Sequence, residues 1–120
     1  MRLFIVVAAV ATVCSLSAQT PKAESKAPAG DAQYGRKLFT SDGCYICHNR
    51  EGQGGFGTAP HLAPKPIPFP AFSAYVRHPS GQMPPFTSKA LPDKDLADIY
   101  AFLQSIPELP PVKSIPLLNN

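Results

Sequence analysis

The clearest hydrophobic periodicity in the chain lies near its C-terminal end. Apolar residues recur there at spacings of three and four, at Leu96, Ile99, Tyr100 and Leu103, which is the pattern of an amphipathic helix with one buried face. Aspartates at the start of this stretch suit the positive end of a helix dipole, and a proline after it disfavours further helix. The pattern therefore predicts a helix over 93–105.

A shorter pattern predicts another helix that begins at Ala32, because Asp31 before it can cap its N-terminus. Tyr34 and Leu38 are four residues apart and so share one face. Gly35 lies inside this helix, where glycine costs up to about 1 kcal/mol relative to alanine. We expect that another helix backbone comes close at Gly35, the alternative being a weak helix that tolerates glycine.

Between and after these helices the chain is too rich in proline for long regular elements. The sequence holds 15 prolines, four of them within 64–70, and proline interrupts both helices and sheets. We expect a loop over 64–70, a short helix over 71–77 with Pro70 at its first position, and an extended, proline-rich tail over 108–120. The predicted fold class is all-α, with short helices joined by irregular loops.

The N-terminal segment differs in composition from the rest. A basic residue at position 2 precedes an apolar run over 3–13 and then small and polar residues, which is typical of a secretory signal peptide. The run is too short to span a bilayer core of about 30 Å at a rise of about 1.5 Å per residue. Cys14 leaves a lipoprotein anchor as an alternative, although a valine precedes it. We expect a signal peptide over 1–18, a Pro/Ala/Lys-rich linker over 19–30, and export to the periplasm.

Length and charge narrow the function. A chain of 120 residues is enough for one small domain, whose core would be marginal without a covalent or metal staple. The net charge is +3, with basic and acidic residues interspersed. No basic run indicates a nucleic-acid partner, and no acidic block indicates a solvating tail.

The chemistry centres on the stretch Cys44-Tyr45-Ile46-Cys47-His48. The pattern C-x-x-C-H is that of c-type haem attachment, in which two thiols bond the macrocycle and the histidine ligates the iron. A zinc site would need further closely spaced ligands, and a thiol redox pair would follow a strand of a βαβ unit. Neither feature is present, so we predict one covalently attached haem c, with His48 as the proximal ligand.

Two later residues complete this predicted site. Pro60 follows His48 by twelve positions, and its carbonyl could accept a hydrogen bond from Nδ1 of the imidazole, which would orient the ring. Met83 lies in a loop stiffened by two prolines, where a thioether would be held as the second iron ligand. The alternative for Met83 is a gap-filling core residue.

Other residues near the motif have weaker assignments. His61 and His78 compete with Met83 for the sixth iron position, but we expect each at the surface or beside a haem propionate. Arg77 or His78 is expected to contact a propionate, because arginine pairs well with carboxylates; the alternative is a solvated arginine. Four glycines within 52–57 predict an irregular loop close to the haem edge.

Taken together, these residues resemble a class I cytochrome c. The resemblance covers about residues 31–107 and rests on Gly35 with Phe39, the motif Cys44–His48, Pro60 with Leu62, Met83 with Pro84, and Leu96 with Tyr100. It implies a small all-α fold wrapped round one haem, with the first and last helices crossing near Gly35 and Tyr100 and Met83 as distal ligand. His61 stands where many members carry a different polar residue.

The resemblance implies one-electron transfer rather than catalysis. The first hypothesis is a periplasmic electron carrier that exchanges electrons with redox protein donors and acceptors. The second is a haem subunit of a periplasmic or membrane-bound dehydrogenase or oxidase complex, which the sequence does not separate from the first. A catalytic or gas-binding haem protein needs an open iron position, against which Met83 argues, and a thiol oxidoreductase is the alternative without haem.

Overall fold

The computed structural model describes residues 26–118 apart from 56 and 58, and its secondary structure is helical. Its elements are α1 (Ala32–Ser41), α2 (Cys44–His48), α3 (Phe69–Arg77) and α4 (Asp93–Ser105), followed by two short 3-10 helices, η1 (Val112–Ser114) and η2 (Pro116–Leu118). The described part of the chain contains no strand, and its one isolated bridge joins Gly55 and Ala59. The prediction of an all-α fold is confirmed.

The predicted signal peptide, Cys14 and most of the predicted linker lie outside the described residues. The last part of the linker is described, and Ala27 packs there against the hydrophobic core. None of the helices found between residues 26 and 118 combines the length and apolar character that a membrane span requires.

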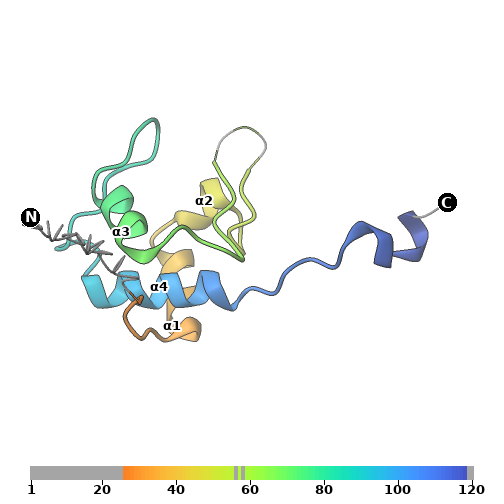
Figure 1. Cartoon of the computed structure of the whole chain (residues 1–120). Coiled ribbons are helices and arrows are strands. Elements are labelled where there is room, and N and C mark those ends of the chain that lie inside the picture. Colours follow the sequence, from red (N-terminus) through yellow and green to blue (C-terminus); the bar gives the residue numbers. More distant parts are fainter. Residues whose placement is uncertain (1–25, 56, 58, 119–120) are drawn as a thin grey trace, which may run out of the picture.

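The helices α1 and α4 cross each other (Figure 1), and Gly35 lies at their closest contact. A Cβ atom on Gly35 would overlap the backbone carbonyl of Asp98 and come within 2.8 Å of the backbone nitrogen of Ile99. Beside this contact, the rings of Phe39 and Phe102 pack with their centroids 5.5 Å apart. The prediction that Gly35 is a close contact between helix backbones is therefore confirmed.

The same crossing contains a buried carboxylate. Asp98 is only 1% exposed, and its two oxygens accept hydrogen bonds from the backbone N–H of Asp31 at 2.7 Å and from Nζ of Lys94 at 2.8 Å. The bond from Lys94, supported by that from Asp31, holds the pKa of Asp98 below its usual value in spite of burial. Asp31 in turn caps α1 as predicted, because its side chain accepts backbone N–H groups of the first turn.

Tyr100 lies on a different side of α4 from this crossing, toward α3. Its ring packs against Phe69 and Phe72, with centroid distances of 5.2 Å in both cases. Its hydroxyl donates a hydrogen bond to the backbone carbonyl of Ile67 at 3.1 Å. The helix crossing thus involves Gly35 with residues 98 and 99, and Tyr100 instead fixes the segment that leads into α3.

The helix bounds show where proline-based reasoning held and where it failed. α4 has its predicted bounds, and α1 begins at the predicted residue. α3 begins at Phe69, so the prediction of a loop through Pro70 and a helix from residue 71 is wrong by two residues. The first N–H groups of a helix have no intrahelical partner, so Pro70 fits the second helical position as well as the first.

The C-terminal tail runs away from the helices (Figure 1). The prediction that it is extended is wrong in part, because it contains the 3-10 helices η1 and η2. Backbone N–H groups of Ser114 and Ile115 donate to the carbonyls of Pro111 and Val112, at 2.8 and 3.0 Å. The φ angle that proline fixes suits a 3-10 turn as well as an extended chain. Non-proline residues between the prolines supply the N–H groups that close these turns.

Candidate haem-binding site

The helix α2 contains all five residues of the C-x-x-C-H motif. Gly43 adopts a φ angle of 79° directly before it, a left-handed conformation that glycine takes at no steric cost, so the chain can turn sharply from α1. Residues three apart on a helix share a face, which brings both thiols to one side of α2. Cys44 is partly buried, Cys47 is exposed, and both are free thiols.

The surroundings of Cys44 keep its free side chain protonated. Burial, and next the carboxylate of Asp42, raise the pKa of the Cys44 thiol to about 11, against a smaller opposing effect of a backbone hydrogen bond. At neutral pH this residue therefore carries S–H. A haem vinyl group would take the sulfur of Cys44 on one carbon and a hydrogen atom on the other, which would form the thioether bond.

His48 is buried, with 8% of its surface exposed, and its ring is oriented by the backbone. Nδ1 lies 3.1 Å from the carbonyl oxygen of Pro60, which is the contact expected from the sequence. A neutral imidazole that donates from Nδ1 keeps its free lone pair on Nε2, where a metal can bind. The hydrogen bond would also raise the basicity of that nitrogen.

The loop that follows His48 folds back on itself. The backbone N–H of Gly54 donates to the carbonyl of His48 at 3.0 Å, and that of Leu62 donates to the carbonyl of Gly52 at 2.7 Å. A Cβ atom on Gly52 would lie 2.8 Å from a side-chain carbon of Leu103. These glycines are therefore needed where the loop packs against the protein itself, and the predicted approach to a haem edge remains a prediction.

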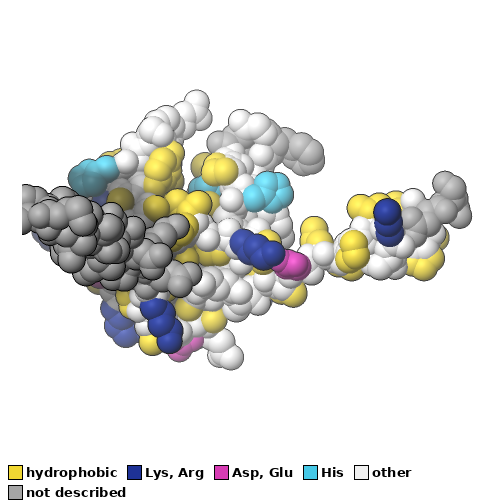
Figure 2. Space-filling model, viewed as in Figure 1, with side chains coloured by type: hydrophobic (Ala, Val, Ile, Leu, Met, Phe, Trp, Pro, Cys, Tyr) yellow, Lys and Arg dark blue, Asp and Glu magenta, His cyan; other side chains and the backbone are white. Residues whose placement is uncertain are grey.

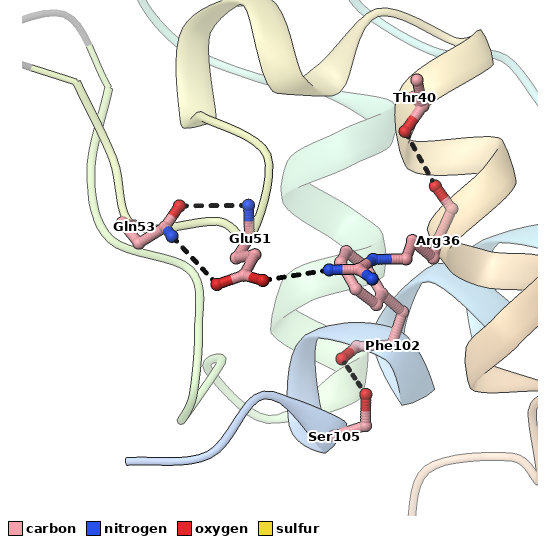
Figure 3. Close-up of polar contacts among 6 residues, drawn as sticks. All are labelled: Arg36, Thr40, Glu51, Gln53, Phe102 and Ser105. Carbon is pink, nitrogen blue, oxygen red and sulfur yellow. Dashed lines mark hydrogen bonds and ion pairs between the residues drawn. The ribbon is translucent and has the colours of Figure 1, made fainter. Parts of the chain in front are cut away.

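A polar cluster connects this loop to α1, and it had no signal in the sequence (Figure 3). Nη2 of Arg36 lies 3.0 Å from a carboxylate oxygen of Glu51, and the side-chain carbonyl of Gln53 accepts the backbone N–H of Glu51 at 3.0 Å. The guanidinium of Arg36 also lies 5.5 Å from the ring centroid of Phe102. Exposed ion pairs contribute about 0–1 kcal/mol, so this cluster orders the loop more than it stabilises the fold.

The loop that contains Met83 rises from the other side of the domain, next to α3 (Figure 1). It is closed at its base, because the backbone N–H of Phe86 donates to the carbonyl of Val76 at 3.1 Å and Nη1 of Arg77 donates to the carbonyl of Phe86 at 2.9 Å. Met83 is half-buried and packs against the hydrophobic core. The structure thus gives this loop fixed ends.

Arg77 has a second protein partner. Its Nη2 lies 2.6 Å from a carboxylate oxygen of Asp93, and its side chain is 15% exposed. The guanidinium therefore ties α3 to the start of α4, a role that the sequence did not indicate, and the predicted contact with a propionate remains a prediction. His61 and His78, the other candidate ligands, are both exposed.

The molecular surface is hollowed between the lobe of α2 with its loop and the lobe of α3 with the Met83 loop (Figure 2). Hydrophobic side chains line the visible walls of this hollow. The donor set consists of two thiols one helical turn apart, an imidazole whose Nδ1 is already bonded, and a thioether on the opposite lobe. These residues fit a c-type haem, because soft sulfur and imidazole are its characteristic protein ligands.

Comparison with known families agrees with this geometry. A family model described as cytochrome c oxidase, cbb3-type, subunit III matches residues 30–103, which is more than half of the chain and includes all the residues just described. The chain belongs to this cytochrome c family. No curated protein and no solved structure matches it significantly. The resemblance to class I cytochromes c is confirmed. The protein is therefore a haem-based electron-transfer protein.

Proposed function

We propose that this cytochrome c domain is a periplasmic one-electron carrier with a single haem c, ligated by His48 and Met83. The observation that carries the proposal is the hydrogen bond from Nδ1 of His48 to Pro60. It fixes the imidazole directly after the two thiols of the motif, in the tautomer that an axial ligand needs. When bound, the haem supplies an iron that reversibly gains and loses one electron.

Each of the protein groups has a separate task. Cys44 and Cys47 hold the macrocycle covalently, and Pro60 orients His48. The loop of Met83 is fixed at both ends, and prolines follow the methionine directly, so its conformational freedom is small. Rigid ligands that stay bound in both oxidation states limit rearrangement during electron transfer, which favours a carrier over a catalyst with an open iron position.

The exposed side of α2 is the proposed route for electrons. Cys47 is exposed, and its neighbours Tyr45 and Ile46 have 38% and 73% of their surfaces exposed. A haem bonded to Cys47 would cover part of this surface, and we propose that a redox protein docks where its edge lies beside Tyr45 and Ile46. Apolar and aromatic residues of this kind are enriched where proteins bind each other.

A second candidate is a haem subunit of a dehydrogenase or oxidase complex, in the periplasm or at the membrane. The description of the matching family, which names an oxidase subunit, favours this candidate. Both functions use the same haem site and differ in whether the domain stays bound to a complex. Both also require export, for which residues 1–18 are the proposed signal peptide, 19–30 the linker and 31–107 the haem domain.

Expression of the full chain in a bacterium that attaches haem c in the periplasm tests the proposal. We expect a periplasmic protein with one haem per chain, which a pyridine haemochrome spectrum measures, and a monomer by size-exclusion chromatography. Native electrophoresis of membranes and periplasm from the source cell, stained for haem, separates the candidates: a small free species supports the carrier, and a single large complex supports the subunit. A periplasmic protein without covalent haem would refute both.

A further inference from the structure

We propose that Asn49 and Gly54 are positioning residues that form a latch, which holds the carbonyl of Pro60 against Nδ1 of His48 and thereby lowers the reduction potential of the haem. This inference rests on the proposed role of His48 as an iron ligand. It concerns the part of the glycine-rich loop around Gly54, which packs against residues 59–61.

The latch joins both peptide groups of Gly54 to the residues at the end of α2. The N–H of Gly54 donates to the carbonyl of His48 at 3.0 Å. The carbonyl of Gly54 accepts a hydrogen bond from the side-chain amide of Asn49. Two bonds from adjacent residues leave the Gly54 backbone little freedom to move relative to His48.

On its other side, Gly54 lies against the segment that contains Pro60. A Cβ atom at Gly54 would be 2.8 Å from the carbonyl oxygen of Ala59 and 3.0 Å from both the carbonyl carbon of Pro60 and the backbone nitrogen of His61. The next residue continues the contact, since the N–H of Gly55 donates to the carbonyl of Ala59 at 3.2 Å. Gly54 is therefore bonded to the backbone of His48 and lies close to that of Pro60, and a side chain there would push the Pro60 segment away from His48.

The backbone of Asn49 is strained. Its φ and ψ angles are 61° and 168°, a combination that is nearly confined to glycine. Among residues 26–118, leaving aside 56 and 58, no other non-glycine residue has a positive φ. Such strain persists only where the surroundings enforce it, and it occurs preferentially at functional sites. Here the strained residue, Asn49, directly follows the proposed ligand His48, and its side chain is bonded to Gly54.

Release of the latch should change the haem electronically. A hydrogen bond from Nδ1 makes the imidazole a stronger donor, which stabilises the oxidised iron more than the reduced iron and lowers the potential. Gly54→Ala should lengthen the bond from His48 to Pro60, and the potential should then rise. Exchange of the Nδ1 proton with solvent should become faster by about tenfold, the change expected for loss of one ordinary hydrogen bond.

The loop offers a matched control. Gly57 also has a left-handed backbone, with φ of 74° against 80° for Gly54, but a Cβ atom there would meet nothing within 4 Å. Gly57→Ala therefore introduces the same backbone strain into the same loop without the contact to Pro60. We expect the reduction potential and the proton exchange of Gly57→Ala to equal those of the unmutated protein.

A second variant separates positioning from stability. Asn49→Gly removes the side-chain bond to Gly54 and also relieves the strained backbone, so the denaturation midpoint should change little. The potential should nevertheless rise, as in Gly54→Ala, and this readout would not move if Asn49 were merely structural. Asn49→Gly decides the matter alone if Gly54→Ala fails to assemble.

The measurements are the midpoint potential by redox titration, the Nδ1 proton exchange by NMR, and the spin state of the unmutated protein. A low-spin, covalently bound haem in the unmutated protein supports the proposed function whatever the variants do. If Asn49→Gly and Gly54→Ala then have the potential and exchange rate of Gly57→Ala, the latch is refuted and the proposed function is not. If the unmutated protein has no low-spin, covalently bound haem, the proposed function itself is refuted.

Discussion

Substitution of Gly35 tests the packing on which the whole domain depends. In an exposed helix, replacement of glycine by alanine gains up to about 1 kcal/mol of stability, because alanine restricts the unfolded chain. Helix propensity alone thus predicts that Gly35→Ala stabilises the protein. The structure predicts the opposite sign, since the added methyl group would overlap the carbonyl of Asp98.

The magnitude follows from what has to move. The obstructing atoms belong to the backbone of α4, so they cannot rotate away, and α1 must shift as a body. That shift would loosen the contact between Phe39 and Phe102, which are 1% and 2% exposed. Overpacking of this kind costs about 1–3 kcal/mol. After the gain in propensity is subtracted, Gly35→Ala should lower the free energy of unfolding by about 1–2 kcal/mol, and Gly35→Leu by about 3 kcal/mol.

The assay is guanidinium unfolding of the haem-loaded protein, followed by far-ultraviolet circular dichroism. Lys37→Ala is the control, because Lys37 is an exposed residue of the same helix and should change stability by no more than about 0.5 kcal/mol. A Gly35→Ala variant as stable as the unmutated protein, or more stable, would show that α1 and α4 do not meet at this residue.

Three further predictions concern the haem and its surroundings. Haem should stay with the unmutated protein through acidic organic extraction, whereas Cys44→Ala combined with Cys47→Ala should lose it; haem that washes out of the unmutated protein would contradict thioether attachment. Because the hydrogen bond from Lys94 lowers the pKa of Asp98 in the folded state, its contribution to stability is present above the ordinary carboxyl pKa of about 4 and is lost as the pH falls through the lower folded value. Thermal midpoints should therefore fall more on acidification in the unmutated protein than in Asp98→Asn, and parallel curves would contradict this. Arg77→Gln should lower the reduction potential if Arg77 contacts a propionate, because the propionate charge that is then left uncompensated stabilises the oxidised iron; if the potential is unchanged and only the denaturation midpoint falls, Arg77 serves only its contacts with the protein.

The sequence predicted the elements whose signals are local. The bounds of α4 followed from a complete apolar pattern that ends before Pro107, and the start of α1 followed from the capping residue Asp31. Gly35 could be assigned to a helix contact because glycine is otherwise unfavourable inside a helix. The His48–Pro60 hydrogen bond was expected as well, since a ring placed under an iron needs an acceptor for its second nitrogen.

What escaped prediction depends on contacts between distant residues or on backbone angles. The ion pair between Arg77 and Asp93 was not predicted, because Asp93 lies on a different helix. The glycines after His48 indicated a close approach without naming its partner, and nothing local distinguishes the strained Asn49 from an ordinary loop asparagine. The turns of the tail were missed because proline allows both extended and 3-10 conformations.

The central claim is a six-coordinate haem with His48 and Met83 as ligands, and near-infrared absorption of the oxidised protein tests it most directly. We expect the weak sulfur-to-iron band, and little carbon monoxide bound by the reduced form at neutral pH. Met83→Ala should abolish the band, admit carbon monoxide and lower the potential by on the order of a hundred millivolts. Absence of the band from the unmutated protein, together with ready binding of carbon monoxide, would contradict Met83 ligation and favour a catalytic or gas-binding haem.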